Sequence, residues 1–171
     1  TRVLKTKQDV TVDTTGSDGR VYAGTLAFEV RDHDVRKLPV TKTKIMVNIA
    51  TPDAAFEKSF LPVRGVGLAR EEFIIAGEIG IHPNALIDYK AKKLKDKAIG
   101  AEIERRIRGW QDPEQFYIDT LAYGIAKIGA AFYPREVIVR FSDFKTNEYR
   151  TLLGGDRYEP AEENPMLGWR G

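Results

Sequence analysis

The sequence contains no cysteine among its 171 residues. A chain without cysteine forms no disulfide framework, and its composition fits a reducing compartment, so we predict a cytoplasmic location. There is also no run of eighteen apolar residues and no secretory signal peptide. These absences leave an ordinary globular protein, with 42% hydrophobic and 30% charged residues, long enough for one domain with a sizeable core.

The sequence also has no large excess of basic or acidic residues. The 27 basic and 25 acidic residues leave a net charge of +2, which gives no general argument for a nucleic acid or membrane partner. The basic run "KAKKLKDK", residues 90–97, has no interleaved aromatic residues, so we interpret it as a solvated helix face. The two histidines lie in unremarkable places: His33 in a polar stretch, and His82 before a proline that opens a helix, where a capping or surface position is favoured.

The chain begins on strand-like alternation without an initiator methionine and stops at "NPMLGWRG", so we expect a piece of a longer protein. Residues 1–25 predict short β-strands, because "VLKTK", "DVTVD" and "RVYAG" alternate apolar and polar residues around the turn "TTGSDG". "LAFEV" could add one more strand. Residues 26–43 are mixed, and because "RDHDVRKLPVTKTK" is polar with one proline, they are interpreted as a linker.

From residue 44 the pattern changes to strands followed by helices. Apolar runs at residues 45–50, 65–70 and 136–141 predict three strands. A helix between the last two strands is predicted to start at "DPEQ", which resembles a capping box. Apolar residues at spacings of three and four give this helix a core stripe: Tyr117, Leu121, Ile125, Ile128 and Phe132. Strand and helix units in this order predict an α/β fold with a parallel sheet. Residues 44–171 supply about half of the roughly 250 residues of a (β/α)₈ barrel, so a partial barrel of about three units is expected.

Two arginines stand at the predicted ends of the second and third strands. Arg70 ends "GVGLAR", and Arg140 interrupts the apolar run "VIVRF". Parallel folds bind ligands at these strand ends, and two guanidinium groups there would suit a carboxylate or phosphate. The alternative is a pair of structural ion pairs, with Glu71, Glu72 or Asp143 as partners, and spacing alone does not decide between them. Asn48, at the end of the first strand, could line the same site or hold the following turn.

Three ordered motifs resemble signatures of the phosphoenolpyruvate-utilising enzyme family. They are "GVGLAREEFI", "VIVRFSDFKTNEYRTLLGG" and "EENPMLGWRG", and "SDFKTNEY" after "GAAFYP" is most similar to the synthase branch of that family. The resemblance implies a swivelling phosphohistidine domain ending near residue 25 and a substrate-binding barrel from residue 44. It also implies that Arg70 and Arg140 bind the anionic groups of pyruvate or phosphoenolpyruvate, with Arg170 supporting the transferred phosphoryl group.

The resemblance further implies what the rest of the enzyme does. The synthase branch converts ATP, pyruvate and water to AMP, phosphoenolpyruvate and phosphate through a phosphohistidine, and it needs Mg²⁺. The family's T-S-H type phosphocarrier motif, its catalytic cysteine and its nucleotide domain are absent here, and its metal ligands belong to later strands. We therefore expect no metal, ATP or turnover from this chain alone. The alternatives are a pyruvate phosphate dikinase or phosphotransferase-system enzyme I, or an inert assembly module, and the exposed strand edges predict self-association.

Overall fold

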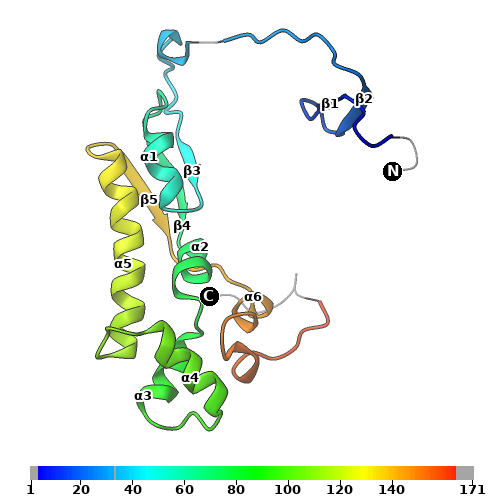
Figure 1. Ribbon diagram of the computed structural model, residues 1–171. Helices are drawn as coiled ribbons and strands as arrows, with labels where there is room; N and C mark the ends of the chain where they lie inside the picture. The colour runs from blue at the N-terminus through cyan, green and yellow to red at the C-terminus, as the bar shows by residue number, and fades with distance from the viewer. Residues whose placement is uncertain (1–3, 33, 165–171) are drawn as a thin grey trace. The chain divides into compact units, whose positions relative to one another are not determined.

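The computed structural model describes residues 4–32 and 34–164 (Figure 1). The chain divides into two compact units, residues 1–34 and residues 35–171. No helix in the described part of the chain is long and apolar enough to cross a membrane.

The first unit is built around one β-hairpin. Strands β1 (Val10–Asp13) and β2 (Arg20–Ala23) pair antiparallel, as the alternation predicted. The hydroxyl of Thr11 donates to the carbonyl of Gly24 and accepts from the amide of Leu26, which fastens the chain after β2. The expected strands in "VLKTK" and "LAFEV" are wrong where the structure describes them, since residues 4–7 and 26–30 form no strand. Their large apolar side chains stay exposed, and Phe28 is 83% exposed.

The second unit combines a small parallel sheet with helices. Its strands are β3 (Val47–Ile49), β4 (Gly65–Arg70) and β5 (Glu136–Arg140). Its α-helices are α1 (Asp53–Ser59), α2 (Glu72–Ile74), α3 (Pro83–Lys90), α4 (Lys97–Arg106), α5 (Pro113–Phe132) and α6 (Thr146–Arg150). A π-helix, η2 (Ile75–Ile79), continues α2, and 3₁₀ turns η1 (Val35–Lys37) and η3 (Gly155–Arg157) complete the order.

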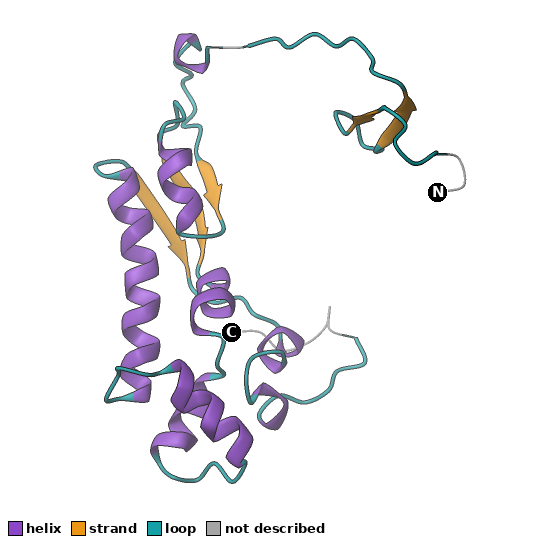
Figure 2. Ribbon diagram, viewed as in Figure 1, coloured by secondary structure: helices purple, strands orange, loops and turns teal. Residues whose placement is uncertain are grey.

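The strand order β3-β4-β5 confirms the predicted parallel sheet of consecutive strands. Helices α1 and α5 cover one face of it (Figure 2). The buried residues between them are Ile49, Ala55, Val66, Ala69, Ile74, Ile128 and Phe132, with Val137 and Val139 of β5 packed against them. The start of α5 is also confirmed, because the carboxylate of Asp112 accepts hydrogen bonds from the amides of Glu114 and Gln115.

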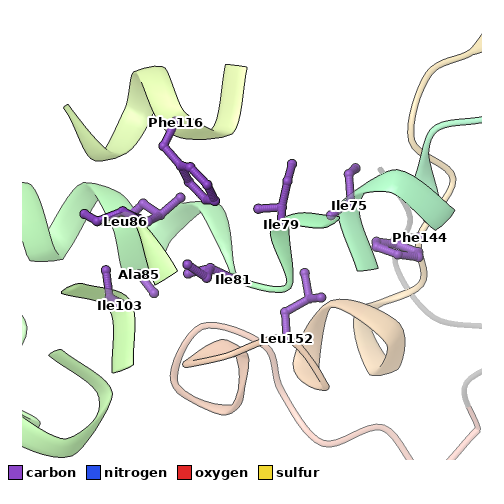
Figure 3. Close-up of a cluster of buried hydrophobic side chains, with 10 residues drawn as sticks. Ile75, Ile79, Ile81, Ala85, Leu86, Ile103, Phe116, Phe144 and Leu152 are labelled. Carbon is purple, nitrogen blue, oxygen red and sulfur yellow. The ribbon is translucent and has the colours of Figure 1, made fainter. Parts of the chain in front are cut away.

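A second hydrophobic cluster lies beyond the carboxyl end of the sheet (Figure 3). It joins η2, α3, α4 and the start of α5 to the segment after β5, through Ile79, Ile81, Leu86, Phe116, Phe144 and Leu152, among others. A parallel bridge between Ile81 and Leu153 fixes the two segments in register. This cluster holds the turn after β4 and the turn after β5 in place around the ends of the two strands.

Within the described residues of this unit, no helix packs on the other face of the sheet. Ile138 is 47% exposed, and Phe141 is 90% exposed. Alternation along residues 136–141 predicts that Val139 and Phe141 face the helices and that Arg140 faces the opposite side. The structure confirms this for Val139 and Arg140, but the prediction for Phe141 is wrong because β5 ends at Arg140. The third strand, β5, is therefore half exposed. The architecture is a mixed α/β fold with a three-stranded parallel sheet.

Candidate functional site

The two predicted arginines are direct neighbours in the sheet. Arg70 is the last residue of β4 and Arg140 the last residue of β5, and the register of the parallel pair matches Arg70 with Arg140. Their preceding residues, Ala69 and Val139, pack into the core under α1 and α5. Because side chains alternate along a strand, both arginines leave the sheet on the uncovered face at its carboxyl end.

A cavity of about 290 Å³ opens where the two strands end. It is lined by side chains from the end of β4, α2, η2 and the turn after β5: Arg70, Glu72, Phe73, Ala76, Arg140, Asp143, Phe144, Lys145 and Glu148. The size suits a small ligand, at the lower end of the range for ligand pockets. Basic and acidic groups meet around it, so the partner of each guanidinium decides what the cavity can bind.

Arg140 meets carboxylates. Its Nη2 donates to Oε1 of Glu72 at 2.5 Å, and its Nη1 lies 3.3 Å from Oδ2 of Asp143. Glu72 is 6% exposed, whereas the Arg140 side chain retains 41% of its exposure. The ion-pair alternative for Arg140 is therefore realised in this structure, although nearly half of its surface still faces the cavity and solvent.

Arg70 has a different environment. Within residues 4–32 and 34–164 it takes part in no salt bridge, and its guanidinium carbon lies 5.8 Å from the centre of the Phe73 ring. A guanidinium beside an aromatic face keeps its full charge and its hydrogen-bond donors. Among the described residues, Arg70 is therefore the cation of the cavity that is available to an added anion.

The acidic pair after Arg70 holds the turn after β5. Glu72 accepts a hydrogen bond of 2.8 Å from the amide of Asp143. Glu71 is 8% exposed, and burial raises the pKa of its carboxyl group, with the charge of Glu72 adding to the rise and the backbone amide of Ser142 opposing it. The sequence shows Glu71 and Glu72 directly after a predicted strand. It does not show that both contact the turn after β5, some seventy residues further along the chain.

The remaining candidates lie elsewhere. His82 is confirmed as a helix cap, because its Nδ1 accepts a hydrogen bond from the amide of Asn84. The alternative of a surface position is wrong, since His82 is 2% exposed and its Nε2 lies 3.0 Å from Oε1 of Glu159. Asn48 is exposed and does not line the cavity. His33 and Arg170 lie outside the described residues. Sequence reasoning did not single out Phe73 or Lys145, which also line the cavity, because neither stands at a strand end.

No group of three or more histidine, aspartate or glutamate side chains in the described part of the chain could hold a metal ion. The carboxylates of the cavity are already engaged with Arg140, the backbone amides of the turn or, in the case of Glu148, the amide of Lys145. The described residues therefore form no cluster of three metal-ligating side chains at the cavity, and the sequence contains no glycine-rich phosphate loop.

Comparison with known proteins decides which family these residues belong to. Residues 27–171 match the family described as "PEP-utilising enzyme, PEP-binding domain". The chain belongs to the PEP-utilising enzyme family. The family match includes Arg70, Glu72, Arg140 and the whole lining of the cavity.

Curated relatives in this family share about half of their residues with the chain. It is 51% identical over 172 residues to phosphoenolpyruvate synthase of Deinococcus radiodurans, 50% over 173 residues to that of Synechocystis, and 48% over 172 residues to that of Escherichia coli K12. Each alignment covers the entire chain but only 21–22% of the relative. The chain thus spans about a fifth of the length of these enzymes, within their PEP-binding part.

Proposed function

We propose that this chain supplies the anion clamp of a phosphoenolpyruvate synthase, with Arg70 and Arg140 binding the carboxylate or phosphate of pyruvate or phosphoenolpyruvate. The observation that carries the proposal is the pairing of the two arginines in register at the carboxyl ends of β4 and β5, over one cavity. The family description and the names of the relatives support the choice of ligand.

The two arginines suit this work in different ways. A guanidinium presents its donors in a rigid fork that matches carboxylate and phosphate oxygens, which a lysine ammonium does not. Arg70 provides charge that no carboxylate of the described residues neutralises, and Arg140 provides donors that are already held in position by Glu72. Together they bind and orient a small anion at the strand ends, and they stabilise negative charge that develops on a transferred phosphoryl group.

The reaction of the whole enzyme is then ATP, pyruvate and water going to AMP, phosphoenolpyruvate and phosphate. On this proposal, the groups that bind ATP and Mg²⁺ lie outside the described residues. The role of this chain is limited to substrate binding and orientation. A pyruvate phosphate dikinase or an enzyme I would use the same clamp with a different phosphoryl source, and the relatives' names favour the synthase.

We also propose that β3, β4 and β5 are consecutive strands of a (β/α)₈ barrel. The support is their order, their parallel direction, the helices on one face and the exposed apolar residues on the other, such as Ile138. A barrel buries that inner face with strands from the rest of the ring. The uncovered face equally fits an assembly surface, which is the reason to keep a scaffold function as the second candidate.

Kinetics of variants in the full-length enzyme test the clamp. Arg70→Ala should lower kcat/KM for pyruvate by about 10² to 10³, the usual effect of removing one electrostatic donor, and Arg140→Lys should lower it substantially. Arg64→Ala is the matched control, because Arg64 is an exposed arginine just before β4, at the opposite end of the same strand. Wild-type turnover and pyruvate affinity in both Arg70→Ala and Arg140→Lys would show that the arginines are only structural.

A further inference from the structure

Glu72 makes an unusual set of contacts for a residue that would not touch the substrate anion. Its Oε1 accepts hydrogen bonds from Nη2 of Arg140 and from the amide of Asp143. Glu72 is the first residue of α2, which follows closely after the strand that ends in Arg70. Its side chain is nearly buried, and Oε2 has no hydrogen-bond partner among the described residues. The hydrogen bonding of this carboxylate is therefore directed at the end of β5.

We propose that Glu72 is a positioning residue of the clamp, which fixes the Arg140 guanidinium and the turn that follows it before the anion arrives. This inference rests on the proposed function of Arg70 and Arg140. Glu72 acts through Arg140 and not by contact with the substrate.

The physical reason is the freedom of the arginine side chain. Arg140 is 41% exposed at the end of a half-exposed strand, so an unpaired guanidinium there would sample many rotamers. A buried carboxylate restricts it to one place, and a clamp that is ordered before binding loses less entropy when the ligand arrives. Asp143 cannot do this alone, because its side chain is 42% exposed and its contact to Arg140 is longer.

The same contact also joins the two strand ends. Glu72 lies two residues after Arg70, so its bonds to Arg140 and to the amide of Asp143 hold the end of β5 against the turn that follows β4. Removing Glu72 should therefore raise the KM for pyruvate and lower kcat/KM by about 10- to 100-fold, which is the loss that follows when a partner that orients a metal ligand is removed. Glu72→Gln keeps an acceptor oxygen and should lose less than Glu72→Ala.

A double-mutant cycle in the full-length enzyme tests the inference, with Glu72→Ala, Arg140→Ala and the double variant measured for kcat and KM. If Glu72 acts through Arg140, Glu72→Ala should change kcat/KM less than twofold once Arg140 is already alanine. Glu78→Ala, an exposed glutamate on the following helical turn, is the control and should match wild type. Thermal melting checks that each variant folds, and Glu72→Gln replaces Glu72→Ala in the cycle if the latter does not.

The outcomes separate the two claims. An equal loss from Glu72→Ala with and without Arg140 would overturn the positioning role and assign Glu72 to the stability of the turn. Wild-type kinetics in Glu72→Ala would overturn it as well. Wild-type kinetics in Arg140→Ala would instead refute the proposed clamp itself, and the positioning role with it.

Discussion

Two glycines in α5 provide a sharp test of how tightly the helix packs behind the candidate site. A Cβ atom added at Gly124 would lie 2.8 Å from Cγ2 and 3.0 Å from Cδ1 of Ile74, which is 1% exposed. A Cβ atom added at Gly129, one and a half turns further along the same helix, would meet nothing within 4 Å. Substitution by alanine should therefore raise the stability at Gly129 but not at Gly124.

The magnitudes follow from two competing terms. Replacing glycine by alanine inside a helix stabilises it by about 0.5–1 kcal/mol where there is room, and this is the expected gain for Gly129→Ala. At Gly124 the same gain is opposed by overpacking of about 1–3 kcal/mol. Gly124→Ala should thus lie between unchanged and about 2.5 kcal/mol less stable than wild type, with a gap of about 1–3 kcal/mol between the two variants.

Urea denaturation of the 171-residue chain, followed by far-UV circular dichroism, measures the free energy of unfolding of each variant. In a thermal melt the gap corresponds to about 2–4 °C per kcal/mol for a chain of this size. Gly124→Ala as stable as Gly129→Ala would refute the close packing of α5 on α2. The result also bears on the site, because Ile74 follows Glu72 by two residues in α2.

Three further predictions concern charge, assembly and activity. Burial raises the pKa of Glu71 above its ordinary value of 4.5, so the fold loses stability as the pH rises above 4.5 and the buried carboxyl group ionises. Glu71→Gln should therefore be more stable than wild type at pH 7 but not below pH 4.5. Thermal melts across pH test this, with Glu78→Gln as the control, and a gap that does not depend on pH would contradict it. The exposed Ile138 and Phe141 predict self-association that Phe141→Asp weakens, which light scattering measures; a wild-type monomer at high micromolar concentration would count against it. The chain alone should form no AMP from ATP, pyruvate and Mg²⁺, because it lacks the phosphocarrier motif, and turnover that survives further purification would disprove this.

The order of the elements in the second unit was predictable because each depends on local signals. Continuous apolar runs indicated the strands, and Pro83 and Asp112 marked helix starts where the structure has them. Parallel strands in consecutive order then bring their carboxyl ends together, so the neighbourhood of Arg70 and Arg140 followed from chain order alone.

The errors arose where burial depends on distant partners. Alternation in residues 26–30 resembled a strand, but no second strand pairs with it in the described part of the chain. Phe141 resembled the continuation of a buried strand, yet the strand ends one residue earlier and leaves it exposed. A local pattern indicates which residues could share a face, but not whether another element covers that face.

The contacts of the site show the same limit. His82 is buried because Glu159 and the ring of Tyr158, more than seventy residues away, close over it. The sequence offered Glu71, Glu72 and Asp143 equally as partners of Arg140, and only the folded turn selects Glu72 and Asp143. Ion-pair partners across such separations are fixed by packing and carry no local sequence signal.

A crystal structure of the full-length enzyme with bound phosphoenolpyruvate tests the central claim most directly. The clamp predicts that one anionic group of the ligand lies within hydrogen-bond distance of the guanidinium groups of both Arg70 and Arg140, with Glu72 still bonded to Arg140. A ligand bound away from the ends of β4 and β5, with Arg140 engaged only by Glu72 and Asp143, would contradict it.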